Sequence, residues 1–174
     1  MSGTNNRLTP INNRGILTSM KYSDKVLEFA TKAHEGQTRK YTGVPYITHP
    51  IAVAEIAVKQ SGYLAGSIIE KISSIAYLHD ILEDYKFTKV TESDLREFLL
   101  SVVNWDDEVE TIMTAVKLLT KKEENFDLFE YLDGIKSNVY AKLVKLADLE
   151  HNMSDLTDKK KLDKYKLIKY YLEH

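Results

Sequence analysis

The 174-residue chain contains no cysteine. This absence excludes disulfide bonds and thiolate metal sites, and it favours a cytoplasmic protein. Proline and glycine are scarce, with 3 and 7 residues, so few positions interrupt a helix. No apolar run approaches the roughly 18 residues of a transmembrane helix, and the N-terminus lacks a signal-peptide core. We therefore expect a cytoplasmic protein without a membrane partner.

Positive charge is not in excess either, since 24 Lys and Arg face 26 Asp and Glu, for a formal net charge of −2. No basic stripe is present, so a nucleic-acid partner is not expected. The length suits one hydrophobic core of ordinary size. The first 20 residues are polar and show no hydrophobic periodicity. We expect a loose arm over residues 1–20 and a single domain over residues 21–174.

Hydrophobic periodicity predicts an all-α fold, because apolar residues recur at helical spacing and no convincing strand pattern appears. Ser23 is the expected cap of the first helix. Pro50 suits the first turn of a second helix, which stops near Gly62. Thr91 and Asp94 resemble a capping box. Further helices are predicted over about 64–83, from 91, from 106 or 107, and over about 126–132, 137–156 and 162–171.

Residues 79–84, with the sequence HDILED, place ionisable side chains within apolar, helix-forming sequence. Charge in such a setting is expensive unless it has a partner. If this segment continues the preceding helix, residues four apart are neighbours. His79 would then lie beside Glu83, and Asp80 beside Asp84, so that all four line one edge of the helix.

A second segment, residues 145–152, contains Asp148 and Asn152 four residues apart on one helix face. If the two helices pack together, their acidic and imidazole side chains would converge. His49, at or beside the start of another helix, would supply a further ligand. The sequence thus predicts a metal site formed by His49, His79, Asp80 and Asp148.

Two imidazoles and two carboxylates, with positions left for water and substrate, suit manganese, iron, magnesium or another octahedral ion. A closed structural zinc site normally uses thiolates. Such a metal acts as a Lewis acid and lowers the pKa of bound water. Glu83 and Asp84 remain to position or deprotonate that water. The pattern is typical of a hydrolase.

Each feature taken alone has a simpler explanation. A His-Asp pair arises often by chance, and Asp148 and Asn152 would suit a surface helix equally well. Lys145 is a candidate to reach a substrate phosphate, although a solvated lysine face is the simpler account. The lysine runs at 121–122 and 159–161 are most simply solvated helix ends. His34 and His151 are expected to orient neighbouring groups rather than to bind metal.

Taken in order, the segments resemble the HD-domain phosphohydrolases, and within them the hydrolase domain of RelA/SpoT homologues. The chain looks most like the stand-alone small alarmone hydrolases. The resemblance runs through residues 33–50, 79–84, 115–121 and 145–153. It implies an HD-domain helical bundle with a metal site between helices, manganese being the usual ion. The implied reaction is removal of the 3′-pyrophosphate from ppGpp or pppGpp, giving GDP or GTP and pyrophosphate.

The resemblance also implies residue roles. Glu83 and Asp84 match the acidic pair that activates the attacking water, and the four residues named above match the metal ligands. Tyr41 and Tyr46 lie near the same loop and are candidates to stack on a base. The substrate-binding candidates are Arg39, Lys40, Tyr41, Lys145 and Asn152.

Departures from the family pattern gather near the nucleotide. The loop over residues 39–45 is one residue longer than the common form. Two expected arginines are Leu149 and Ser154, and Asp155 stands where threonine is common. Two alternatives therefore remain: an HD phosphohydrolase acting on another nucleotide, such as a nucleoside tri- or monophosphate or NADPH, and an inactive nucleotide-sensing module. The sequence does not indicate the oligomeric state.

Overall fold

A computed structural model describes residues 21–62, 65–121 and 126–174. The predicted all-α fold is confirmed, since the only β-type pairing in these ranges is an isolated bridge between Thr38 and Pro45. The predicted arm over residues 1–20 lies outside the described residues. The helices are α1 Tyr22–Ala33, α2 Thr48–Ser61, α3 Gly66–Leu78, α4 Tyr85–Thr88, α5 Glu92–Val102, α6 Asp106–Leu119, α7 Leu128–Lys136, α8 Val139–Ser154 and α9 Lys159–Glu173.

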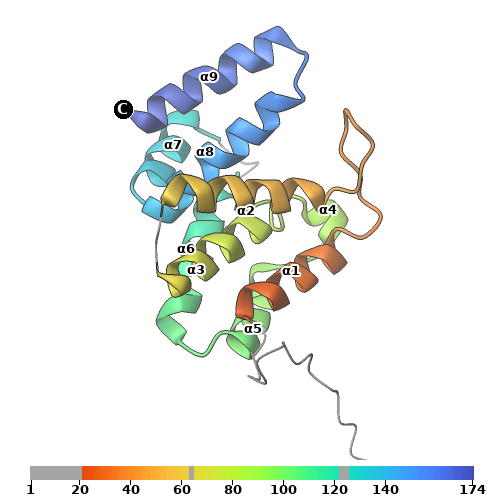
Figure 1. Ribbon diagram of the computed structural model, residues 1–174, viewed down its shortest axis with the longest axis vertical. Coiled ribbons are helices and arrows are strands. Elements are labelled where there is room, and N and C mark those ends of the chain that lie inside the picture. The colour runs from red at the N-terminus through yellow and green to blue at the C-terminus, as the bar shows by residue number, and fades with distance from the viewer. Residues whose placement is uncertain (1–20, 63–64, 122–125) are drawn as a thin grey trace, which may run out of the picture.

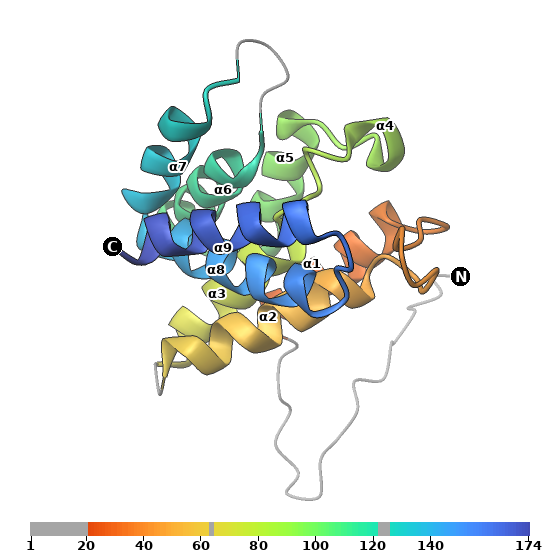
Figure 2. The same cartoon turned by 90° about the horizontal axis from the view of Figure 1, so that it is seen from above.

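Helix α3 lies at the centre of the bundle, where α1, α2, α6 and α8 all pack against it. Helices α7 and α9 gather at one end of the molecule, and α1 and α5 at the other (Figure 1). Seen from above, α9 lies along α8 (Figure 2), and the two helices pack together. No described helix is both long and apolar enough to cross a membrane.

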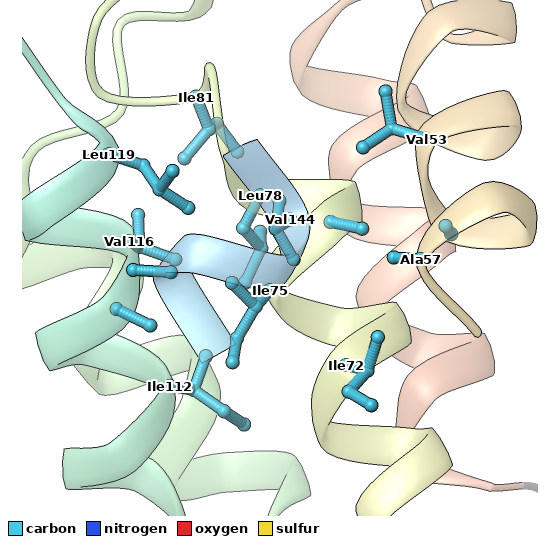
Figure 3. Close-up of a cluster of buried hydrophobic side chains, with 14 of the residues drawn as sticks. Val53, Ala57, Ile72, Ile75, Leu78, Ile81, Ile112, Val116, Leu119 and Val144 are labelled. Carbon is cyan, nitrogen blue, oxygen red and sulfur yellow. The ribbon is translucent and has the colours of Figure 1, made fainter. Parts of the chain in front are cut away.

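The hydrophobic core surrounds the second half of α3. Ile75 and Leu78 of α3 are fully buried. In Figure 3 they lie between Val53 of α2 and Val116 of α6, close to Val144 of α8. Each such side chain contributes about 1.5–3 kcal/mol on burial. The core thereby fixes the end of α3, after which His79 and Asp80 follow.

Several predicted helix ends are confirmed. Thr91 and Asp94 form a capping box before α5, since each side chain accepts a hydrogen bond from the backbone N–H of the other. Helix α6 begins at Asp106, and Pro50 lies in the first turn of α2. Helix α2 ends before Gly62, whose φ of 76° is a left-handed conformation that favours glycine.

The expected cap of α1 and the expected end of α3 are wrong. Ser23 does not cap α1, because it is already the second helical residue and its side chain is buried. Helix α3 ends at Leu78 rather than near residue 83, and residues 79–84 form turns before α4. The Ile81 backbone N–H bonds the Leu78 carbonyl, and the Ile81 carbonyl accepts a hydrogen bond from the Thr88 hydroxyl at 2.8 Å. The chain therefore turns while Ile81 stays buried in the core.

Candidate active site

The four predicted metal ligands converge from three parts of the fold. His49 comes from the first turn of α2, His79 and Asp80 follow α3, and Asp148 lies in α8. His49 Nε2 lies 3.2 Å from Asp148 Oδ1 and 3.6 Å from Asp80 Oδ2. His79 Nε2 lies 3.0 Å from Asp80 Oδ2 and 3.7 Å from Asp148 Oδ1. The packing of α2 against both α3 and α8 thus brings four donor side chains around one point.

The hydrogen bonds of the two histidines orient them as ligands. His79 Nδ1 donates to the Ala76 carbonyl at 2.7 Å, which leaves Nε2 as the ligand atom. This Nε2 is buried and makes no hydrogen bond to the described residues, although two carboxylates lie near it. His49 Nδ1 lies 2.8 Å from His151 Nδ1, so His49 also turns Nε2 toward the carboxylates. Nitrogen and carboxylate donors of this kind fit a divalent cation.

Electrostatics in the cluster favour a bound positive charge. Burial disfavours the charged form of His79, but Asp80 and Asp148 outweigh it and raise the pKa of His79 to about 10. Burial likewise opposes ionisation of Asp80, yet the His79 imidazole beside it lowers the Asp80 pKa. Both carboxylates are therefore charged, and their field attracts a proton or a cation to the space between the imidazoles.

Lys145 is not part of a solvated lysine face. Its Nζ lies 2.7 Å from Asp148 Oδ2, and the exposed fractions of the two side chains are only 11% and 7%. Burial opposes the charge on Asp148, but Lys145 lowers the Asp148 pKa well below its usual range. Asp148 therefore presents one oxygen to Lys145 and the other to His49.

Glu83 and Asp84 do not share one helix edge with His79 and Asp80, because the helix has ended before them. Glu83 pairs with Lys121, whose Nζ lies 2.9 Å from Oε1. Asp84 accepts a hydrogen bond from Gln37 Nε2 at 2.8 Å, and burial raises the pKa of its carboxyl. The two acids lie on the same turn, but each is held by a different partner.

A cleft of about 360 Å³ opens over the cluster. Lys40 and Tyr41 are not among the residues that line it, and Tyr41 is 48% exposed. Helix α9 adds Lys161 and Tyr165, so one lysine of the run at 159–161 lines the cleft, while Lys159 and Lys160 are exposed at the helix end. Two larger grooves, of about 750 and 810 Å³, contain none of the four clustered ligands. The predicted site residues that line the cleft are Arg39, His49, Asp80, Glu83, Lys145, Asp148 and Asn152.

Arg39 is held at the edge of the cleft by residues at the end of α8, in the segment that differs from the family pattern. Its guanidinium donates to Asn152 Oδ1 at 3.1 Å and to Asp155 Oδ2 at 2.8 Å. Asn152 in turn donates through Nδ2 to Asp148 Oδ1. The predicted contacts Arg39 and Asn152 are thus connected to the ligand cluster, and Asp155 offsets the Arg39 charge.

Sequence reasoning missed several residues of the site. Tyr46, a candidate to stack on a base, donates its hydroxyl hydrogen to Asp80 Oδ2. Gln37 holds Asp84, and Lys121, which the sequence suggests is a solvated helix end, pairs with Glu83. Gln37, Tyr46 and Lys121 all lie inside the motif segments, which is the one signal that singles them out. Their partners are distant in sequence, and spacing alone does not reveal them.

Comparisons with known proteins agree with this geometry. The pattern of the HD domain family matches residues 46–153. The guanosine-3′,5′-bis(diphosphate) 3′-pyrophosphohydrolase of Haemophilus influenzae is 36% identical over 129 residues, and the chain spans 17% of its length. Human MESH1, which carries the same enzyme name, is 35% identical over 130 residues, covering 74% of this chain and 66% of MESH1.

A solved structure shares the fold. It belongs to a metazoan orthologue of SpoT whose description states that it hydrolyses ppGpp. The TM-score is 0.66 and the sequence identity 22%, covering 90% of this chain and 86% of that one. The fold, the converging imidazoles and carboxylates, and the match over residues 46–153 lead to one conclusion: the chain belongs to the HD domain family.

Proposed function

We propose that this protein is a metal-dependent hydrolase that removes the 3′-pyrophosphate from ppGpp or pppGpp. The observation that carries the proposal is the convergence of His49, His79, Asp80 and Asp148 beneath a cleft that Glu83 lines, with Asp84 next to Glu83 in the same turn. The names of the relatives from Haemophilus influenzae and human supply the substrate class. A cytoplasmic location, a single domain over residues 21–174 and a role in the stringent response complete the proposal.

The cation, for which we propose manganese, would be held by His49, His79, Asp80 and Asp148. When bound, it supplies Lewis acidity that polarises a phosphoryl oxygen and makes water more acidic. Asp84 takes a proton from the attacking water, and a half-buried carboxylate with a raised pKa suits that task. Water oxygen bonds to phosphorus while the bond between phosphorus and the 3′-oxygen breaks. Pyrophosphate is released, and the proton taken by Asp84 passes to the 3′-oxygen, which stays on the nucleotide as a hydroxyl.

The cleft also offers positive charge to the phosphates. Lys121 and Lys145 line it beside Glu83 and Asp148, and their charges offset the charge that develops on phosphoryl oxygens. We propose that Arg39 and Asn152 contact the nucleotide, because both line the cleft. Lys40 and Tyr41 do not line the cleft, so they would reach the nucleotide only from the loop over residues 39–45.

A panel of nucleotides tests the activity. The protein is incubated with Mn²⁺ and, separately, ppGpp, pppGpp, GTP, a nucleoside monophosphate or NADPH, and the products are separated by anion exchange. We expect GDP and pyrophosphate from ppGpp. No pyrophosphate release from either alarmone would overturn the proposal.

A second candidate is hydrolysis of another nucleotide by the same site. Its support is the ion pair between Arg39 and Asp155 at 2.8 Å, in which Asp155 offsets the positive charge of Arg39 at the cleft edge. Turnover of a triphosphate, monophosphate or NADPH without turnover of ppGpp would favour it. An inactive sensor is less well supported, because the set of ligand and acidic side chains is complete.

A further inference from the structure

A short chain of hydrogen bonds links a buried histidine to Asp84. His34, which is 3% exposed, follows α1 and lies with its Nδ1 2.7 Å from Gln37 Oε1. Gln37 Nε2 donates to Asp84 Oδ2 at 2.8 Å. Neither His34 nor Gln37 belongs to the ligand cluster. The bond joins a loop near the N-terminal end of the described chain to the turn after α3, 47 residues later.

The chemistry of the three side chains fixes which of them donates and which accepts in each hydrogen bond. An ionised carboxylate only accepts hydrogen bonds, so the Gln37 amide must turn its NH₂ group toward Asp84. Gln37 Oε1 then faces His34, which must donate through Nδ1–H. His34 Nε2 is buried and makes no hydrogen bond to any described residue. His34 therefore has one polar contact for its ring, and that contact points toward Asp84.

The backbone of the same loop is firmly held. The Gln37 N–H donates to the His34 carbonyl at 3.0 Å, and the Gln37 carbonyl accepts from the Tyr46 N–H at 2.8 Å. Gly36 has a φ of 81°, so the turn between His34 and Gln37 requires a residue that tolerates this conformation. The His34 and Tyr46 rings lie 4.9 Å apart. Since Tyr46 also donates to Asp80, one loop orients acids at both ends of the turn after α3.

We propose that Gln37 and His34 are positioning residues for Asp84. This inference rests on the proposed function, in which Asp84 takes the proton of the attacking water. Gln37 occupies Oδ2 and so directs Oδ1 to that proton, while His34 prevents the amide from rotating. The pair acts on the water-activating step and leaves nucleotide binding to the other side of the cleft.

Kinetics of matched variants test this role. Gln37→Met removes the amide at nearly constant length, and we expect kcat for ppGpp to fall about 10–100-fold with KM changed less than about threefold. Gln60→Met is the control, because Gln60 also bonds a carboxylate, that of Glu150 at 2.9 Å, on the exposed surface. His34→Leu should behave as Gln37→Met does. His34→Asn retains a donor near the position of Nδ1 and should recover most of the activity. Equal effects of Gln37→Met and Gln60→Met would overturn the inference.

A double-mutant cycle separates positioning from general loosening of the loop. If Gln37 acts through Asp84, Gln37→Met should cause no further loss in an Asp84→Asn background. Multiplicative losses, or a rise in KM equal to the fall in kcat, would contradict the inference. Failure of the wild type to hydrolyse any nucleotide would instead overturn the proposed function.

A ¹⁵N spectrum of the histidines tests the link without any turnover. We expect His34 Nδ1 to carry the proton in the wild type and to lose this preference in Gln37→Met. An unprotonated Nδ1 in the wild type would refute the link whether or not the protein is active.

Discussion

Charged side chains in the cleft compensate one another, and those of Lys145 and Asp148 are also buried. Lys145 offsets Asp148, Lys121 offsets Glu83, and Arg39 offsets Asp155, at distances of 2.7, 2.9 and 2.8 Å. A buried pair is costly to break, because removing one partner leaves the other uncompensated. Asp148 therefore has a fixed position before any ligand arrives, whereas the exposed pair of Lys121 and Glu83 contributes less.

Glu83→Gln tests the acidic pair. The substitution keeps the shape but removes the charge, so the attacking water loses part of its activation. We expect kcat for ppGpp to fall about 10²–10⁴-fold, as for loss of an acid-base group, with cation affinity changed little. Steady-state kinetics and calorimetry measure the two quantities. Glu97→Gln on the exposed face of α5 is the control, and an equal loss there would speak against a specific role.

Cation binding should release a proton. Since the carboxylates raise the pKa of His79 to about 10, His79 is protonated in the metal-free protein near neutral pH. A cation binds only the neutral ring, so its apparent affinity should rise about tenfold per pH unit up to that pKa. Calorimetry at one pH in two buffers of different ionisation enthalpy measures the proton count. Identical heats in the two buffers would contradict the assignment of His79.

At the scale of elements, the sequence predicted helices best where side-chain chemistry is local. The capping box at Thr91 and the glycine after α2 lie where the spacing placed them. Helix α9 begins at Lys159 after an Asp158 cap, three residues before its predicted start. The end of α3 was misplaced because Ile81 and Leu82 continue the apolar pattern. Only the fold shows that Ile81 packs in the core from a turn.

Thr91→Ala tests the cap of α5. Because Thr91 accepts from the Asp94 N–H, its loss should lower the free energy of unfolding by about 1 kcal/mol. Activity should not change, because α5 lies away from the cleft. Thr114→Ala is a matched control within α6, where alanine is the better helix former by about 0.5 kcal/mol. Chemical denaturation should show opposite signs for the two variants. Equal shifts would contradict the capping role.

At the scale of the molecule, the site depends on contacts between distant parts of the chain. The sequence supplied the ligand types, and the structure brings all four together. Spacing already places Lys145 beside Asp148 on one face of α8, but it could not supply the burial of that pair. Nor could it supply the pairing of Lys121 with Glu83, which are 38 residues apart. Burial is a property of packing, and that of Lys145 becomes visible only when α8 is placed against its neighbours.

Cation binding should stabilise the whole fold, since its ligands come from α2, the turn after α3, and α8. A ligand that binds only the folded state, at 100 times its Kd, adds about 2.7 kcal/mol. We expect Mn²⁺ to raise the melting temperature and a chelator to reverse the rise. Asp148→Asn should reduce the response to Mn²⁺. An undiminished response in that variant would place the cation elsewhere.

The long separation of the ligands along the chain also bears on biosynthesis. His49 and His79 leave the ribosome well before Asp148, which lies about 70 residues beyond His79. A nascent chain that has not yet released α8 has an uncovered face on α2 and α3 and lacks one of its acidic ligands. The complete cation site would therefore form only after α8 has been synthesised, and a product truncated before α8 would lack it.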